Sequence, residues 1–386
     1  MSAFATDLIA WQRTGGRHDL PWQNTTDPYR IWVSEIMLQQ TQVSAVVDRY
    51  KTFLARFPDV HCLAAATQEE VLACWSGLGY YSRARNLHAA AQTIVTRHRG
   101  RFPLTAADLA GLPGIGRSTA AAVACFAGTD AQAILDGNVK RVLARVFAVE
   151  GWPGRAEVER RLWQLADELL PRASGYEALR DYTQGLMDLG ATLCTPRDPR
   201  CGACPIAARC QARATDRVRE LPAPRPARTL VTRLADWALI LSGARVLLEV
   251  RPARGLWGGL WALPEIRSPS TEHQIHRLDA NAVSAWLQHH PALTGQSAGA
   301  QAGIGRRAGI AQIEALEPAV RHAFTHFRLE ARVWKILPAD VAHPYTDQAS
   351  DAPAGEHREL RWLSLKPESI AAAPLPTPVR RLLSTL

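Results

Sequence analysis

The chain has little lysine: only four of its 45 basic residues are lysines, namely Lys51, Lys140, Lys335 and Lys366. Chemistry that needs a lysine amine as a nucleophile therefore has few candidates. The chain also has no run of about eighteen apolar residues, which a membrane-spanning helix needs. Its N-terminal sequence lacks the basic segment and apolar stretch of a secretory signal. These absences predict a cytoplasmic protein with no membrane partner.

Seven cysteines are present, but their spacing argues against a disulfide framework. Three are scattered, and four form the pattern C-x6-C-x2-C-x5-C, at Cys194, Cys201, Cys204 and Cys210. Four thiolates so close in sequence suit one tetrahedral metal centre or one iron–sulfur cubane better than two disulfides. Zinc sites usually combine two C-x2-C pairs, and this run has only one, so a [4Fe–4S] cluster is favoured over zinc. Ordinary buried or free cysteines are the remaining alternative.

The net charge of the chain is +9 and its isoelectric point is near 9.5. This basic excess favours a polyanionic partner such as nucleic acid, although a ribosomal or membrane-surface protein would carry a similar charge. At 386 residues the chain can bury two or more cores, which indicates a multidomain protein. Charge and length alone leave the kind of partner open.

A proline-rich segment divides the chain after the clustered cysteines. Residues 221–228, LPAPRPAR, hold three prolines and predict a stiff, extended linker. Residues 1–220 show apolar residues at three- and four-residue spacing, including a long run over residues 27–57, and predict a helical domain. Residues 229–386 change to short β-rich runs, with a hairpin around Ser242-Gly243, and predict a second domain.

A short Gly-rich segment, LPGIGRSTA at residues 112–120, lies between two helical runs. Gly114 and Gly116 allow a tight turn and expose backbone N–H groups at the start of the next helix, where a phosphate oxygen can bind. This is a helix-hairpin-helix signature, and it predicts sequence-independent contact with a DNA backbone. A simple connection between two helices is the alternative.

Two carboxylates are placed where they could act in catalysis. Glu35 lies one helical turn from Ile31 and Leu38, on a face where burial would raise its pKa and keep it protonated, as a general acid requires. Asp136 precedes a helical run in the sequence ILDGNVK. Both also have a structural interpretation, Glu35 as an acid at the margin of a core and Asp136 as a helix N-cap.

In combination, these features resemble the endonuclease III superfamily of DNA glycosylases and, within it, the adenine DNA glycosylase (MutY) family. The motifs that carry the resemblance stand in the family's order: PWQ, WVSEIMLQQTQV, GLGYYSRARNL, LPGIGRSTA, ILDGNVKRVLAR and QGLMDLGATLC. WGGLWALPE and FTHFRLE resemble the family's MutT-like (Nudix) extension, without the acidic catalytic helix of Nudix hydrolases. The resemblance implies an all-α glycosylase domain with a [4Fe–4S] loop at 194–210, followed by an α+β MutT-like domain that recognises 8-oxoguanine.

The resemblance implies removal of adenine mispaired with 8-oxoguanine or guanine in double-stranded DNA, by a monomer associated with a bacterial nucleoid. Glu35 would protonate N7 of the flipped adenine, and Asp136 would stabilise the cationic sugar left behind. Ser118 stands where bifunctional relatives place a lysine, which implies a monofunctional enzyme that leaves the abasic strand intact. Lys140 is interpreted as a phosphate contact or solvated helix residue in preference to a weak trap for the opened sugar.

The resemblance also assigns residues to substrate and DNA binding. Gln40 and Tyr80 would insert into the base stack around the lesion. The other assigned residues are Trp22, Gln184 and Met187 at the adenine pocket, Gly114, Gly116, Ser118 and Asn138 on DNA, and Phe324, Thr325 and His326 on 8-oxoguanine. Thr325 replaces the serine of the family's Phe-Ser-His loop, which keeps the hydroxyl group and adds a methyl group.

Two other functions compete with this one. An endonuclease III-like pyrimidine glycosylase with lyase activity is opposed by Ser118 and by the C-terminal extension. A non-enzymatic, DNA-binding or redox-sensing iron–sulfur protein would share the cysteines and the hairpin, and it would give no product with adenine-containing duplexes.

Overall fold

The computed structural model describes residues 2–227, 229–266, 278–289, 310–338 and 359–386. The chain divides into two compact units. The first consists of Met1–Ala66 and Arg83–Arg228, and the second of Thr67–Ser82 and Thr229–Leu386. The division at residue 228 falls at the end of the proline-rich segment, whereas the grouping of Thr67–Ser82 with the second unit is not indicated by the sequence. The functional domain limits 1–220 and 229–386 stay a prediction.

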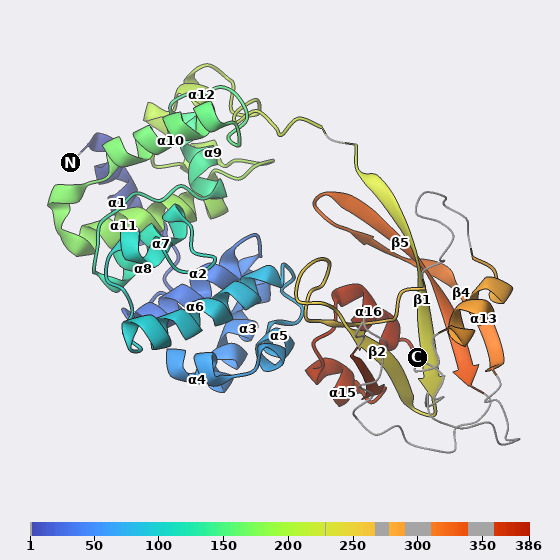
Figure 1. Cartoon of the computed structure of the whole chain (residues 1–386). Helices are drawn as coiled ribbons and strands as arrows, with labels where there is room; N and C mark the ends of the chain where they lie inside the picture. The colour runs from blue at the N-terminus through green and yellow to red at the C-terminus, as the bar shows by residue number, and fades with distance from the viewer. Residues whose placement is uncertain (1, 228, 267–277, 290–309, 339–358) are drawn as a thin grey trace, which may run out of the picture. The chain divides into compact units, whose positions relative to one another are not determined.

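The first unit is helical (Figure 1). Its helices are α1 (Ala3–Gly15), α2 (Pro28–Leu38), α3 (Val43–Arg56), α4 (Val60–Ala65), α6 (Ser82–His98), α7 (Ala106–Ala110), α8 (Arg117–Ala127), α9 (Gly137–Val146), α10 (Ala156–Leu169), α11 (Gly175–Asp188) and α12 (Gln211–Ala214). The alanine-rich α8 is largely buried, because its small side chains let α2, α7 and α11 pack closely against it. None of the helices in the described ranges combines the length and apolar character that crossing a membrane requires.

The run predicted as helical over residues 27–57 is interrupted, which corrects the sequence interpretation. α2 begins at Pro28, behind an N-cap at Asp27 whose side chain accepts a backbone hydrogen bond. The helix stops before Gln40, which has a left-handed backbone with φ of +55°. An α-helix cannot continue through that conformation, and α3 begins only at Val43.

The second unit contains a six-stranded mixed sheet with flanking helices (Figure 1). Its elements are α5 (Gln68–Trp75), β1 (Val231–Ser242), β2 (Arg245–Val250), β3 (Trp261–Ala262), α13 (Ala280–Gln288), β4 (Ile310–Ala323), β5 (Phe327–Pro338), β6 (Leu360–Ser364), α15 (Pro367–Ala372) and α16 (Thr377–Leu383). The strand order is β3-β2-β1-β5-β4, and β6 pairs with β2. β1 and β5 are parallel. The predicted hairpin is confirmed, because Leu241 pairs with Val246 across Ser242-Gly243.

Side chains along β1 alternate between two cores, as expected for successive residues of a strand. Trp237 and Leu239 pack in a core that includes residues of α15 and α16. Ala238 and Ile240 pack in a second core with residues of α13. The sheet is therefore covered on both faces, and the predicted order of a helical domain before an α+β domain is confirmed.

Candidate active site

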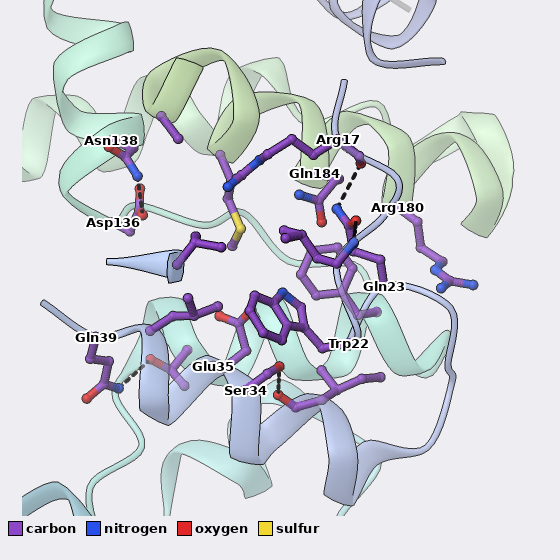
Figure 2. A pocket seen from close by; sticks show the side chains of 18 of the residues that line it. Arg17, Trp22, Gln23, Ser34, Glu35, Gln39, Asp136, Asn138, Arg180 and Gln184 are labelled. Carbon is purple, nitrogen blue, oxygen red and sulfur yellow. Dashed lines mark hydrogen bonds between the residues drawn. The ribbon is translucent and has the colours of Figure 1, made fainter. Parts of the chain in front are cut away.

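A pocket of about 870 Å³ lies within the first unit. Figure 2 shows its walls, which come from α2, α9, α11 and the segment between α1 and α2. Residues predicted from distant motifs meet there: Trp22, Glu35, Gln40, Ser118, Asp136, Asn138, Gln184 and Met187. Only the tertiary fold brings these side chains into one cavity.

Glu35 lies in the wall of this pocket, on α2, and is half-buried. Ile31 and Leu38, one helical turn away, line the same pocket. Burial raises the pKa of Glu35 to about 8, and the negative charge of Asp136 adds to the shift. The carboxyl group therefore holds its proton at neutral pH, which is the state that a general acid needs.

Asp136 is the N-cap of α9, which confirms the structural interpretation of this residue. Its Oδ1 accepts a hydrogen bond from the N–H of Val139 at 2.7 Å, and its side chain also lines the pocket. Burial raises the pKa of Asp136, while backbone N–H groups and the charge of Arg141 act in the opposite direction. These donors favour the ionised form of Asp136 and oppose the effect of burial on its pKa.

Two arginines of α9 connect the segment that begins at Asp136 to the cysteine loop. Arg141 donates from Nη2 to Oδ1 of Asn138 at 2.8 Å and from Nε to the carbonyl oxygen of Cys194 at 2.7 Å. Arg145 is buried and donates from Nη1 to Sγ of Cys194 at 3.3 Å. The loop thereby holds the helix whose N-cap is Asp136.

The four closely spaced cysteines line one small cavity of about 20 Å³, at Cys194, Cys201, Cys204 and Cys210. Four cysteine thiolates are the donor set of a [4Fe–4S] cubane, in which each thiolate binds one iron atom. The donor set therefore fits an iron–sulfur cluster.

The predicted hairpin joins α7 to α8, and its two glycines differ. Gly114 has a φ of +77°, and a Cβ there would lie 2.6 Å from Cβ of Asn86. Gly116 has an ordinary φ of −87° at the N-cap of α8, and a Cβ there would meet nothing within 4 Å. The fold therefore requires glycine at position 114. The space beside Gly116 is open and lies at the N-terminus of α8, where the helix dipole favours an anion.

We expect this pair of glycines to separate stability from DNA binding. Gly114→Ala should lower the free energy of unfolding by about 2 kcal/mol or more, because alanine is strained at positive φ and its Cβ overlaps a neighbour. Gly116→Ala should change stability by less than about 0.5 kcal/mol but weaken duplex binding. Thermal denaturation and a DNA titration of both variants measure this. Equal losses of stability would contradict the assignment.

Comparison with known proteins identifies the family. Residues 33–168 match the HhH-GPD superfamily of base excision DNA repair proteins, residues 194–210 the iron-sulfur binding domain of endonuclease III, and residues 236–385 the NUDIX domain. The adenine DNA glycosylase of Buchnera aphidicola subsp. Baizongia pistaciae is 33% identical over 286 residues, which cover 74% of this chain and 77% of that protein. The adenine DNA glycosylase of Mus musculus is 34% identical over 420 residues, covering 94% and 74%.

The chain belongs to the adenine DNA glycosylase family. It is a DNA glycosylase of base excision repair, and its cofactor is a [4Fe–4S] cluster, held by the loop at residues 194–210. The predictions of family, enzyme class and cofactor are thereby confirmed. The roles of individual residues stay predictions.

Ser118 and Lys140 occupy different places in this adenine DNA glycosylase. Ser118 lies in the first turn of α8 and lines the pocket, and its Oγ accepts a hydrogen bond from the N–H of Leu135 at 2.9 Å. Nζ of Lys140 lies 2.6 Å from a carboxylate oxygen of Glu159 on α10. Lys140 is thus engaged in an ion pair with Glu159, whereas Ser118 lines the pocket.

Gln40 and Tyr80 share a feature that the sequence does not reveal. Both are exposed and both have left-handed backbones, with φ of +55° and +47°. Non-glycine residues rarely adopt this conformation, and such strain is concentrated at functional sites. The turn at Gln40 is held by Arg83, which donates from Nη1 to the carbonyl oxygen of Gln39 at 2.6 Å and from Nη2 to Oγ1 of Thr41 at 3.0 Å.

Phe324, Thr325 and His326 form the turn between β4 and β5 in the second unit. The ring of Phe324 stacks on Phe327, with centroids 4.5 Å apart, and lies edge-on to His322 at 4.6 Å. Thr325 and His326 are exposed. Packing therefore explains Phe324 in part, whereas the other two side chains are accessible to a ligand.

Sequence reasoning missed three polar residues that shape the pocket, namely Arg17, Arg83 and Asp188. Arg83 and Asp188 are buried, and Arg17 is half-buried. Asp188 stands inside the motif QGLMDLG, which was a usable signal, since an acid among apolar residues needs a partner. Its partner Arg17 is 171 positions away, so no local pattern connects the two.

Proposed function

We propose that this adenine DNA glycosylase removes adenine opposite 8-oxoguanine or guanine in duplex DNA by hydrolysis, and leaves the abasic strand intact. The proposed hydrolysis is supported by one observation: the carboxyl groups of Glu35 and Asp136 line the same pocket. Burial raises the pKa of Glu35 to about 8, and burial also raises the pKa of Asp136, but backbone N–H groups and the charge of Arg141 favour the ionised form of Asp136. Two acids with different protonation states can divide the roles of proton donor and charge stabiliser.

The reaction starts with a base that has left the stack, because the glycosidic bond is inaccessible inside a duplex. The carboxyl group of Glu35 gives its proton to N7 of adenine, so the C1′–N9 bond breaks and the base leaves as a neutral molecule. The positive charge left on the sugar faces the Asp136 carboxylate. Water then adds to C1′, and its proton returns to Glu35, which restores the acid.

The second unit supports the preference for oxidised guanine opposite the adenine. Residues 236–385 match the NUDIX domain, but the sequence after WGGLWALPE lacks the spaced acidic helix of Nudix hydrolases. A domain of this kind can bind an oxidised guanine without hydrolysing a nucleotide. The exposed side chains of Thr325 and His326 are the proposed contacts.

The intact product strand follows from the residue at position 118. A lysine amine there could attack C1′ and lead to strand cleavage, whereas the Ser118 hydroxyl accepts the N–H of Leu135. The nearest lysine in sequence to Asp136 is Lys140, which is paired with Glu159. Neither group offers a free amine to the sugar, so the proposed enzyme is monofunctional.

A single assay tests the substrate and the outcome together. A labelled duplex with adenine opposite 8-oxoguanine is incubated with the full chain and divided, and alkali is added to one half. We expect strand cleavage only in the alkali-treated half, and none with adenine opposite thymine. Cleavage without alkali would contradict a monofunctional enzyme, and no cleavage in either half would contradict the proposed substrate.

We expect a bell-shaped pH dependence of the excision rate. The rate should fall above pH 8, because the Glu35 pKa is raised to about 8 and the carboxylate form cannot donate a proton. The rate should also fall at low pH, because protonated Asp136 is neutral and cannot stabilise the cationic sugar. Burial raises the pKa of Asp136, so this fall should begin at a higher pH than for an ordinary aspartate. Single-turnover rates measure both limbs. A rate that still rises through pH 9 would contradict Glu35 as the acid.

A further inference from the structure

The exposed Tyr80 lies at the end of a strained turn in the second unit. Gly77, Gly79 and Tyr80 all have left-handed backbones, with φ of +99°, +68° and +47°. Glycine adopts this conformation freely, whereas a tyrosine keeps it only when the surrounding structure holds it. Tyr80 is 48% exposed, but Ser76 and Tyr81, which border the turn, are only 2% and 8% exposed. The contacts of these two buried neighbours show how the turn is held.

The hydroxyl groups at the two borders of the turn donate to one carbonyl oxygen. Oγ of Ser76 lies 3.4 Å from the carbonyl oxygen of Leu375, and Oη of Tyr81 lies 3.0 Å from the same atom. Leu375 stands between α15 and α16, and its side chain is fully buried. All three residues belong to the second unit. The C-terminal segment of the chain therefore holds the turn on both sides.

Arg380, on α16, strengthens this attachment. Its Nη2 donates to Oγ of Ser76 at 2.7 Å and to the carbonyl oxygen of Ala373 at 2.6 Å, and its Nη1 donates to the carbonyl oxygen of Ile370. A guanidinium group only donates hydrogen bonds, so the Ser76 hydroxyl accepts from Arg380 and gives its own proton to Leu375. One arginine thus connects α15 and its C-cap to the border of the turn.

The helix before the turn, α5, is fixed to the same unit. Nη1 of Arg361, on β6, lies 3.0 Å from a carboxylate oxygen of Glu69. A Cβ on Gly259 would lie 2.8 Å from Nε2 of Gln68 and 3.1 Å from Cδ1 of Leu72, so the backbone at Gly259 packs directly on α5. The helix and the turn at its end are therefore both held by residues from the C-terminal part of the chain.

We propose that Arg380 and the carbonyl group of Leu375 position Tyr80 for insertion into the base stack beside the mispair. A turn that is ordered before DNA binds does not subtract an ordering cost from the free energy of binding. A loosened turn would lose affinity even though the tyrosine ring remained. Arg380 is in this account a positioning residue, and Tyr80 is the residue that contacts DNA. This inference rests on the proposed function, since it concerns how the same duplex is bound.

A double-mutant cycle tests whether the attachment acts through the tyrosine ring. Two disruptions are made, Arg380→Met and the pair Ser76→Ala with Tyr81→Phe, each alone and each combined with Tyr80→Ala. The substrate is a duplex with adenine opposite 8-oxoguanine. Single-turnover excision at a series of protein concentrations gives the half-saturating concentration of each chain.

Tyr80→Ala alone should raise the half-saturating concentration about tenfold, because stacking of an aromatic side chain on a base contributes roughly that factor. Each disruption should raise it about threefold or more when Tyr80 is present, because the turn must then be ordered on binding. The same disruption should change it less than about twofold in the Tyr80→Ala chain, because no ring is left to position. A purely structural role of Arg380 would give equal changes in both backgrounds.

A control separates these effects from a general loss of stability. Tyr29→Phe also removes a buried tyrosine hydroxyl group that donates to a backbone carbonyl, that of Phe57 at 2.6 Å, and it should leave the half-saturating concentration unchanged. If Arg380→Met does not fold, the Ser76 and Tyr81 pair still tests the attachment with α15 and α16 intact.

The outcomes that contradict the inference differ from those that contradict the proposed function. Equal effects of a disruption with and without the Tyr80 ring, or no effect in either background, would overturn the inference. A Tyr80→Ala chain that saturates like the wild type would overturn it as well, because the ring would then contribute nothing to binding. Failure of the wild-type chain to excise adenine would instead overturn the proposed function.

Discussion

Glu35→Gln is expected to excise adenine at least about a thousandfold more slowly than the wild-type chain while duplex binding survives. Glutamine has nearly the same shape as glutamic acid but no acidic proton, and general acids contribute about 10²–10⁴ in rate. Single-turnover excision with excess protein measures the rate, and a gel-shift titration with the same duplex measures binding.

A matched control shows whether the loss belongs to this site. Glu157→Gln makes the same change on an exposed position of α10, and it should leave excision unchanged. A Glu35→Gln variant with wild-type activity would remove the assigned acid. Equal losses of activity in both variants would point to a general effect of removing a carboxyl group.

The difference in stability between Glu35→Gln and the wild-type chain should also depend on pH. The folded-state pKa of Glu35 is raised to about 8, above its value in the unfolded chain. The contribution of Glu35 to the free energy of unfolding is therefore fully present below the unfolded-state pKa and is lost as the pH rises toward 8. Glutamine does not titrate, so the melting temperature of the variant should rise relative to that of the wild type as the pH increases from 5 to 8. Parallel melting curves across that range would contradict a buried, protonated Glu35.

The second large effect is expected for Asp136→Asn, which should slow excision about a thousandfold. A carboxylate about 4 Å from a full positive charge contributes about 4 kcal/mol at an effective dielectric constant of 20, which is about three orders of magnitude in rate. Asparagine is as good an N-cap as aspartate, so α9 should keep its start and the fold should survive. Single-turnover excision and thermal denaturation measure the two properties separately.

The control for this variant is another aspartate that caps a helix. Asp59 is the N-cap of α4, where its Oδ1 accepts the N–H of Cys62 at 2.8 Å, and it is exposed. Asp59→Asn should keep wild-type excision. If Asp136→Asn lost only as much activity as this control, the N-cap would be the whole role of Asp136, and its charge would have no part in the reaction.

Local patterns revealed much of the fold because they report local physics. Helical spacing, the change to β-rich runs after the prolines, and the hairpin at Ser242-Gly243 depend on residues close in sequence. The break between α2 and α3 was missed because it depends on the left-handed backbone at Gln40. That turn is held by Arg83 from a different helix, and no local pattern indicates such a contact.

The motifs identified Glu35, Asp136 and the four cysteines as candidates, but they could not choose between catalytic and structural interpretations. For Asp136 the fold shows a cap that also faces the pocket. For the cysteines it shows that all four line one small cavity. In both cases the answer depends on distances between chain segments.

The sequence by itself determined the residue types, the order of the two domains, the cysteine spacing and the absence of a lysine at position 118. Only the tertiary structure decided the environment of those residues. A pKa near 8 at Glu35 requires surrounding protein and a second carboxylate, and the orientation of the Gln184 amide requires the buried Asp188 with its distant partner Arg17. Desolvation and hydrogen-bond geometry arise from packing, because both depend on which groups become neighbours after the chain has folded.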